Sequence, residues 1–316
     1  MTRVAALDCG TNSLRLLISD VSDGKMTDVV RAMEIVRLGE GVDKTGRFAP
    51  AALERTFAAL EAYVVDIEKY GVERVRMVAT SATRDAANRD DFLTGVRERL
   101  GVDPEVVSGD EEAALSFVGA TAELRGPASP DTALFPAPYA VCDIGGGSTE
   151  FVVGDETGVL ASRSVDIGCV RMTERHLHGD PPTAEQIAAA TADVDAAIAL
   201  AASTVPLGDA RTLVGLAGSV TTVAALVLGL AEYDAERIHH ARLSATEVAQ
   251  TATSLLAMPR AQRAALGPMH PGRVDVIGAG ALVLDRIMAI GGFAEMVVSE
   301  HDILDGIAWS LAGVEW

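Results

Sequence analysis

The stretch VCDIGGGSTEFVV, residues 141–153, decides how the rest of the chain is interpreted. A short apolar run ends on an aspartate, three glycines follow, and a second apolar run begins, which predicts strand, tight turn and strand. Because glycines carry no Cβ, the backbone N–H groups of such a turn can approach one anion closely, and this geometry suits phosphate. A plain β-hairpin, whose glycines only satisfy turn dihedrals, is the alternative interpretation.

Two carboxylates accompany this turn. Asp143 ends the first apolar run, and Glu150 lies near the start of the second, after Ser148 and Thr149. Hard oxygen ligands suit Mg²⁺, so an acid beside the turn can hold a divalent cation that the phosphates also contact. The stretch therefore indicates a site for phosphate and metal together.

A second copy of the pattern occurs near the N-terminus. The stretch VAALDCGTNSLRLLI, residues 4–18, again has an apolar run, an aspartate, a glycine-containing polar turn and another apolar run. If each copy heads one half of the molecule, the two turns can face each other across a cleft and hold a chain of phosphates from both sides. The repeat therefore predicts a duplicated domain.

Composition limits the classes of protein to consider. The chain has 316 residues, 49% of them hydrophobic, which predicts two domains of about 150 residues each. Its formal net charge of −19 argues against nucleic acid or an anionic membrane as a partner, because those partners require basic surfaces. Cys9, Cys142 and Cys169 lie in apolar, strand-like contexts, which indicates buried reduced thiols in a cytoplasmic protein.

Neither a leader nor a membrane span is predicted. The N-terminus lacks a basic region followed by an apolar core and a cleavage site, so no signal peptide is expected. Residues 212–231 contain no charged side chain, but glycine, serine and threonine interrupt them, so a strand, a turn and a buried helix are favoured over a span. The six histidines show no metal or triad spacing, and most are expected to be solvated or structural.

The periodicities give the order βββαβαβα in the first half, and the same order begins again after a proline-rich segment. We therefore expect an N-terminal domain at 1–124, a hinge at 125–138 and a second domain at 139–316, with a closing helix at 302–316 that can pack back on the first domain. Expected strands are 4–8, 12–19, 27–37, 75–79, 105–107, 139–144, 148–154, 159–167, 212–216 and 295–298. Expected helices follow Pro50, Thr80, Gly109, Thr183 and Gly218, and cover 245–257 and 276–290. The helix after Thr80 is expected to continue toward Leu100.

Duplicated halves that each open on an Asp-Gly turn resemble the actin, sugar-kinase and Hsp70 superfamily. Five blocks are more specific and resemble the exopolyphosphatase and guanosine-pentaphosphate phosphohydrolase (Ppx/GppA) family: DCGTNS, ATSATR, SGDEEA, DIGGGSTE and RVDVI, which begin at residues 8, 79, 108, 143 and 273. The resemblance implies an α/β fold of two actin-like, ribonuclease H-like domains flanking an active-site cleft. Longer members append a helical C-terminal region, so we expect a short, two-domain form.

The resemblance also implies the reaction, which is attack of water on the terminal phosphate of a phosphoanhydride chain. Its transition state spreads negative charge, so positioning and electrostatic neutralisation dominate catalysis. In the family the second glutamate of the Ser-Gly-x-Glu-Glu block acts as the base, and this residue is Glu112 here. Favourable interaction with the N-terminus of its own helix is the structural alternative for Glu112.

The remaining site residues follow from the same resemblance. Asp143 and Glu150 are expected to hold Mg²⁺ (or Mn²⁺) and orient the water, with Asp8 as a further metal ligand or, alternatively, a cap on its turn. Arg15 has two interpretations: its side chain can contact phosphate, or strand alternation can direct it to solvent. The residues expected to contact phosphate are Thr11, Asn12, Ser13, Arg15, Ser81, Arg84, Gly145, Gly146, Gly147, Ser148, Thr149, Gly218, Ser219 and Arg273. The turn at Gly218 can alternatively be a close-packed strand-to-helix connection.

These expectations lead to an exopolyphosphatase that releases orthophosphate from inorganic polyphosphate, in a cytoplasmic homodimer. Hydrolysis of guanosine pentaphosphate (pppGpp), a reaction of the stringent response, is the alternative with the same chemistry, and the five blocks do not separate the two. A phosphotransferase is disfavoured by the water-activating position of Glu112. A non-catalytic sensor of polyphosphate or nucleotide, or an actin-like assembly protein, is disfavoured because Glu112, Asp143 and Glu150 occur together.

Overall fold

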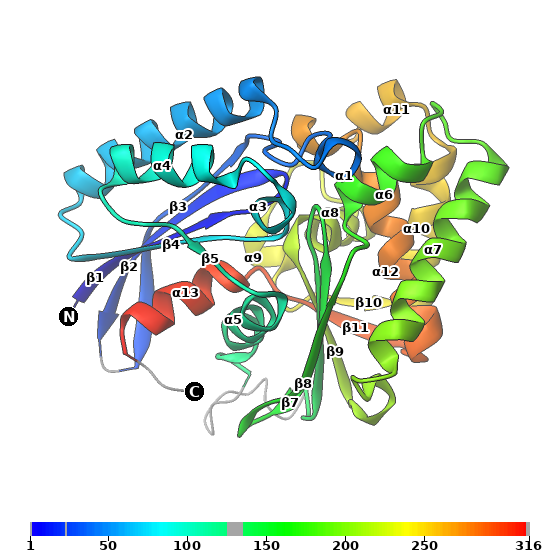
Figure 1. The fold of residues 1–316 in the computed structure, drawn as a ribbon. Coiled ribbons are helices and arrows are strands. Elements are labelled where there is room, and N and C mark those ends of the chain that lie inside the picture. Colours follow the sequence, from blue (N-terminus) through cyan, green and yellow to red (C-terminus); the bar gives the residue numbers. More distant parts are fainter. Residues whose placement is uncertain (1, 23, 125–134, 314–316) are drawn as a thin grey trace. The chain divides into compact units, whose positions relative to one another are not determined.

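The computed structural model describes residues 2–22, 24–124 and 135–313 (Figure 1). Its internal contacts divide the chain into two compact units. Unit 1 comprises Met1–Gly119 and Ile303–Trp316, and unit 2 comprises Ala120–Asp302. Residues 125–134 of the predicted hinge lie outside the described part of the chain.

Unit 1 is built on a five-stranded mixed sheet with the order β3-β2-β1-β4-β5. The first three strands form an antiparallel meander, β4 then adds in parallel to β1, and β5 adds in parallel to β4. Its strands are β1 (Thr2–Cys9), β2 (Ser13–Ser22), β3 (Lys25–Ile35), β4 (Arg74–Ala79) and β5 (Glu105–Val106), and its helices are α1 (Val42–Thr45), α2 (Pro50–Lys69), α3 (Ser81–Asp85), α4 (Arg89–Leu100), α5 (Gly109–Thr121) and α13 (Ile303–Leu311).

Helices cover both faces of this sheet, as Figure 1 shows for α2 and α4 on one face and α13 on the other. The central strand β1 alternates between the two layers. Ala5 and Leu7 pack in the core beneath α2 and α4, whereas Val4 and Ala6 pack in the core with α13. A strand that is buried on both faces requires a continuous apolar run, which explains the sequence of residues 4–7.

Unit 2 repeats this topology. Its sheet has the order β10-β11-β9-β6-β7-β8, in which β6, β7 and β8 form the antiparallel meander and β9 and β11 add in parallel. The strands are β6 (Tyr139–Ile144), β7 (Thr149–Asp155), β8 (Gly158–Val165), β9 (Thr212–Leu216), β10 (Arg242–Ser244) and β11 (Glu295–Val298). The helices are α6 (Cys169–His176), α7 (Ala184–Ala202), α8 (Ala217–Val227), α9 (Ala235–Ile238), α10 (Ala245–Ala257), α11 (Arg260–Ala264) and α12 (Ile277–Gly291).

Local sequence signals set several of these boundaries. Thr183 and Ser244 begin α7 and α10 with capping boxes, in which each hydroxyl accepts from a backbone N–H and the residue at the third helical position bonds back. Pro50 begins α2 at a position where its missing N–H has no intrahelical partner to lose. The predicted α/β class and duplicated order are confirmed by the two sheets.

Three local predictions are wrong. A single helix from the segment after Thr80 to Leu100 is interrupted, because Asn88 and Ala87 bond to Phe48 and Gly46 and pull the chain out of helical geometry between α3 and α4. Cys169 does not lie in a strand-like context but is the first residue of α6, although it is buried as expected. The short strand β10 extends the second sheet beyond the expected five strands.

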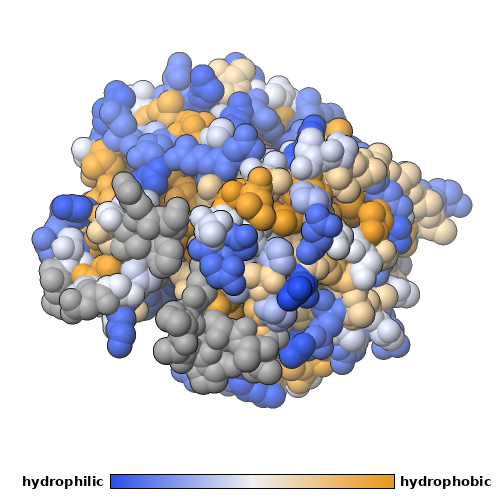
Figure 2. Space-filling view, turned by 90° about the horizontal axis from the view of Figure 1, so that it is seen from below, coloured by the Kyte–Doolittle hydropathy of each residue, from blue (hydrophilic) through white to orange (hydrophobic). Residues whose placement is uncertain are grey.

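Among the described residues, the large hydrophobic side chains that are exposed lie on several different elements, with Val159 and Leu160 adjacent on β8. Val65 lies on α2, Leu160 on β8, Leu200 on α7 and Ile290 on α12, and Figure 2 shows hydrophilic and hydrophobic residues interspersed on one face. In the described part of the chain, no helix is both long enough and apolar enough to cross a bilayer. The uncharged residues 212–231 form β9, α8 and the turn that follows.

Candidate active site

The turns after β1 and β6 have the same backbone arrangement. Strand pairing sets Asp8 opposite Arg15 in unit 1 and Asp143 opposite Glu150 in unit 2. The same hydrogen bond closes each turn. Gly10 N donates to Ser13 O at 3.0 Å, and the corresponding nitrogen of unit 2 donates to Ser148 O at 3.1 Å. The sequence repeat is therefore a repeat of backbone geometry.

In both units, the segment after the third strand covers the carbonyl side of the turn. In unit 1, the Asn12 carbonyl accepts from residues 36 and 37, and the Thr11 carbonyl accepts from Gly39 at 2.8 Å. In unit 2, the three carbonyls of the glycine triplet accept from N–H groups of residues 168–171, at the start of α6. A Cβ on Gly168 would lie 2.3 Å from the carbonyl group of Gly146, so this contact requires glycine.

The backbone N–H groups of each turn differ from its carbonyls in their hydrogen bonding. Among the residues that the structure describes, the backbone N–H groups of Thr11, Asn12, Gly146, Gly147 and Ser148 donate no hydrogen bond to another backbone group. The hydroxyl of Thr11 is also buried without a partner in this described part. Buried or half-buried donors are costly when unsatisfied, so each turn presents a set of donors suited to an anion.

The carboxylates of unit 2 form a buried acidic pair. Asp143 and Glu150 are 6% and 1% exposed, and residues directly opposite on antiparallel strands direct their side chains to the same face. The Ser164 hydroxyl donates to Glu150 Oε1 at 2.7 Å. Two like charges in this position repel each other, and a cation removes the repulsion. An all-oxygen donor set of this kind fits Mg²⁺ or Mn²⁺.

Unit 1 has an acid–base pair at the corresponding position. Arg15 donates to Asp8 Oδ2 from Nε at 3.0 Å and from Nη2 at 2.7 Å, and the Asp8 side chain is 6% exposed. Arg15 thus has a partner within the protein, Asp8, which neither of the two sequence-based interpretations of Arg15 included. The role of Asp8 as a metal ligand stays a prediction, and Arg15 would compete with a cation for that carboxylate.

Glu112 is held at the start of α5 by an arginine that we also predicted to be in the site. Arg84 Nη1 donates to Glu112 Oε2 at 2.7 Å and to the carbonyl of Val107 at 3.0 Å. The Glu112 side chain is only 10% exposed, while the neighbouring Glu111 is 48% exposed and pairs with Arg76. A charge-assisted hydrogen bond fixes the orientation of the Glu112 carboxylate, as a general base requires.

Other predicted residues have positions that the structure defines. The Thr149 hydroxyl donates to the Ile167 carbonyl at 3.1 Å, so it holds the segment after β8. Ser81 is the first residue of α3 and is 3% exposed. Gly218 lies at the start of α8, where a Cβ would lie 1.1 Å from Nη1 of Arg273, so two predicted phosphate ligands are in contact.

Ser219 also lies in this part of unit 2, close to a buried thiol. Burial raises the pKa of the Cys169 thiol, while a hydrogen bond with Ser219 and the charge of Arg273 oppose the shift. Burial likewise raises the pKa of Cys142 to about 12, and the adjacent Asp143 adds to this effect. A thiol with a raised pKa stays protonated, so these cysteines are poor nucleophiles.

Sequence reasoning missed Arg171. Its Nε donates to the Gly147 carbonyl at 2.7 Å, and its side chain is 11% exposed, so it holds the glycine turn from the side of α6. The available signal was Gly168 followed by Arg171 directly after the third strand of the repeat. Without α6 in the prediction, neither residue could be assigned to the turn.

Together, the two sheets of equal order and the two equivalent turns define the class of the protein, which is a duplicated α/β protein of the actin-like fold. A sequence model of the Ppx/GppA phosphatase family matches residues 17–313. The chain therefore belongs to the Ppx/GppA phosphatase family and is a phosphoanhydride hydrolase.

Individual relatives agree with this assignment. The chain is 51% identical over 326 residues to Exopolyphosphatase 2 of Mycobacterium tuberculosis, with 99% of each chain covered. It is 26% identical to a guanosine-5'-triphosphate,3'-diphosphate pyrophosphatase of Aeromonas salmonicida, covering 98% of this chain and 59% of the relative.

Two solved structures resemble this one closely. The crystal structure of an exopolyphosphatase-like protein superposes with a TM-score of 0.93 at 45% identity, covering 98% of this chain and 97% of the other. The Ppx-GppA enzyme of Aquifex aeolicus gives a TM-score of 0.81 at 30% identity, covering 98% and 99%.

Proposed function

We propose that this protein is an exopolyphosphatase that hydrolyses the terminal phosphoanhydride bond of inorganic polyphosphate and releases orthophosphate. The observation that carries the proposal is that, among the described residues, the backbone N–H groups of Thr11 and Asn12 in unit 1, and those of Gly146, Gly147 and Ser148 in unit 2, donate to no backbone acceptor. The proposal is also supported by the relative named Exopolyphosphatase 2, which matches this chain over nearly its whole length.

Local donors of this kind are what a strongly acidic protein needs to bind a polyanion. The net charge of −19 repels polyphosphate at long range, so affinity must come from short-range contacts. Backbone N–H groups aimed at developing negative charge also stabilise the transition state, because they need no reorganisation during the reaction. In unit 2, Gly218, Ser219 and Arg273 would supply further contacts to phosphate.

Glu112 is proposed as the general base. It accepts a proton from water as the water oxygen forms a bond to the terminal phosphorus. The bond between that phosphorus and the bridging oxygen breaks, and the shortened chain leaves with the electron pair. Arg84 positions the Glu112 carboxylate by the 2.7 Å hydrogen bond.

Asp143 and Glu150 would hold the divalent cation through their carboxylate oxygens. A bound Mg²⁺ supplies neutralisation of the charge on the phosphates, which lowers the barrier to attack by water. The Ser164 hydroxyl fixes one oxygen of Glu150, so that carboxylate has a defined orientation before any cation binds.

The test compares Glu112→Gln with Glu111→Gln in a phosphate-release assay. Glu111 is the matched control, because it is the adjacent glutamate but is exposed and pairs with Arg76. Glu112→Gln should lower kcat by about a thousandfold while polyphosphate binding is retained, since the base acts on water and not on the bound chain. Glu111→Gln should keep kcat within about twofold. Equal turnover in the two variants would remove Glu112 from the mechanism.

Hydrolysis of pppGpp is the second candidate, because relatives named for that reaction match nearly all of this chain. One assay with short polyphosphate, long polyphosphate and pppGpp at equal concentration separates the substrates by kcat/KM. A higher kcat/KM for pppGpp would replace the proposed substrate but keep the chemistry. Formation of ATP from polyphosphate and ADP would instead reveal a phosphotransferase.

A further inference from the structure

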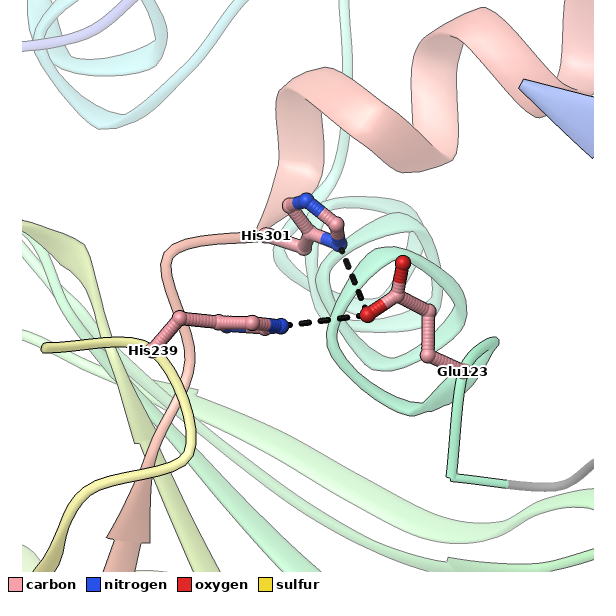
Figure 3. A group of neighbouring side chains, drawn as sticks. All are labelled: Glu123, His239 and His301. Atoms are coloured by element: carbon pink, nitrogen blue, oxygen red, sulfur yellow. Dashed lines mark hydrogen bonds and ion pairs between the residues drawn. The ribbon is translucent and has the colours of Figure 1, made fainter. Parts of the chain in front are cut away.

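Three side chains of unit 2 that belong to neither turn converge on one point (Figure 3). Glu123 follows α5, His239 caps the C-terminal end of α9, and His301 lies between β11 and α13. Figure 3 shows both imidazole rings directed at the carboxylate of Glu123. One potential ligand atom of each residue lies within 4.8 Å of those of the other two.

The distances from the Glu123 oxygen to the two imidazole nitrogens are close to those between ligand atoms around a bound metal. His239 Nε2 lies 3.1 Å and His301 Nδ1 lies 3.7 Å from Oε2 of Glu123. Bonds of 2.0–2.2 Å in a tetrahedral site place neighbouring ligand atoms about 3.3–3.6 Å apart. Small side-chain movements are therefore sufficient to bind a cation. The ring of His240 stacks on His239 with centroids 3.8 Å apart and limits rotation of that ring.

The donor set selects the kind of metal. Two imidazole nitrogens with one carboxylate suit Zn²⁺, whereas Mg²⁺ prefers oxygen ligands throughout. Three protein ligands leave the fourth tetrahedral position for water.

His239 sets a limit on the affinity. The backbone N–H of Glu300 donates to Nδ1 of His239 at 3.2 Å, so a neutral ring carries its proton on Nε2. Binding of a cation at Nε2 requires the other tautomer and the loss of this hydrogen bond. The site should therefore bind more weakly than one whose histidines already have the required tautomer.

We propose that Glu123, His239 and His301 form a binding site for one zinc ion. Two of these residues lie close in sequence to the points where the chain passes from one unit to the other. Glu123 lies four residues beyond Gly119, where unit 1 ends, and His301 lies two residues before Ile303, where unit 1 resumes. Bound zinc thus ties these two parts of the chain to each other, within unit 2. The histidines are 116 residues or more from Glu123 in sequence, so local spacing gave no signal for them.

The test is calorimetric titration of the full chain with ZnCl₂ in phosphate-free buffer, with MgCl₂ in excess to compete for all-oxygen sites. One zinc per chain should bind at pH 7.5, and the affinity should fall in acid because protons compete for imidazole nitrogens. Glu123→Gln and His301→Gln should each weaken binding at least about tenfold. His176→Gln is the matched control, because His176 also contacts a carboxylate, Asp193, at 2.8 Å, but no second imidazole of the described residues joins them in a metal-ligand group.

X-ray absorption of the zinc-loaded protein gives a second readout that does not depend on the variants. It should show nitrogen and oxygen ligands with the scattering pattern of two imidazoles. The proposal is overturned if the wild-type chain shows no saturable zinc binding. It is also overturned if both variants bind as the wild-type chain does, since the zinc would then lie elsewhere. Neither outcome depends on the hydrolytic activity.

Discussion

The turns of units 1 and 2 have nearly the same backbone but opposite electrostatics. Each is closed by one hydrogen bond, of 3.0 Å at Ser13 and 3.1 Å at Ser148, and each is covered on its carbonyl side by the segment after the third strand. Opposite the strand-end aspartate, however, unit 1 places Arg15 and unit 2 places Glu150. One residue thus converts a neutral pair into a doubly acidic one.

The charge of each pair indicates a different role for each of the two duplicated turns. The neutral pair Asp8–Arg15 satisfies its own charge and so contributes structure beside the turn of unit 1. The acidic pair Asp143–Glu150 adds charge that favours a divalent cation. We infer that metal dependence belongs to unit 2, and that the unit 1 turn binds phosphate through its backbone.

The largest expected effect comes from removing the acidic pair. Glu150→Gln should lower kcat by about a thousandfold and shift the Mg²⁺ concentration for half-maximal activity upward, because one of two carboxylates is lost. Asp8→Asn, which changes the unit 1 counterpart of Asp143, should leave the Mg²⁺ response nearly unchanged. Phosphate release measured against MgCl₂ concentration checks both.

An equal shift in the Mg²⁺ response of the two variants would break the comparison, because it would place a metal ligand in each unit. Thermal unfolding of both proteins controls for folding. Glu150 is buried, so its amide replacement must first be shown to unfold cooperatively.

A smaller effect is expected when the neutral pair is broken. Arg15→Met leaves the buried Asp8 carboxylate without its cation, which should lower the free energy of unfolding by about 3 kcal/mol. The double variant Asp8→Asn/Arg15→Met should recover much of this loss, since no unpaired charge remains. Urea unfolding followed by circular dichroism measures both. A loss that is no smaller in the double variant would show that packing, and not charge, makes Arg15 important.

The sequence was sufficient to predict every strand except β10, the duplication and the turn residues, because apolar runs and turn chemistry are local. The register Asp8–Arg15 was not predicted, although the short turn between the two strands fixes it once Gly10 is known to bond to Ser13. Strand alternation alone could not decide whether the Arg15 side chain faces solvent or contacts the substrate.

Features that depend on distant contacts could not be predicted. Helix α6 spans Cys169–His176, too short for a clear apolar period, so Arg171 and its bond to the glycine turn were missed. The break between α3 and α4 depends on Asn88 bonding to Phe48, which lies 40 residues earlier. The pairing of Arg84 with Glu112 likewise required the structure, although both residues were expected in the site.

The segments that follow the third strand of each unit, and that contact the carbonyl side of each turn, give a third way to test the comparison. A Cβ at Gly168 meets the backbone of Gly146 at 2.3 Å, whereas a Cβ at Gly39 meets the side-chain methyl of Thr11 at the same distance. Backbone cannot rotate away, so Gly168→Ala should lower the free energy of unfolding by about 2 kcal/mol, and Gly39→Ala by about 1 kcal/mol. Urea unfolding gives both values. A larger loss for Gly39→Ala would show that the unit 1 turn is the more tightly packed of the two.

The smallest expected difference lies at the first glycine of each turn. Gly10 has room for a methyl group, because its nearest contact is the Ser13 carbonyl oxygen at 3.7 Å. At Gly145 the equivalent oxygen, of Ser148, lies at 3.1 Å, so the turn must open slightly. Gly10→Ala should therefore change the unfolding free energy by less than about 0.5 kcal/mol and Gly145→Ala by about 1 kcal/mol. Because the Gly145 variant also disturbs the donors at Gly146 and Gly147, its KM for polyphosphate should rise while that of Gly10→Ala stays near the wild-type value. Equal KM values in the two variants would mean that the glycine triplet does not contact the substrate.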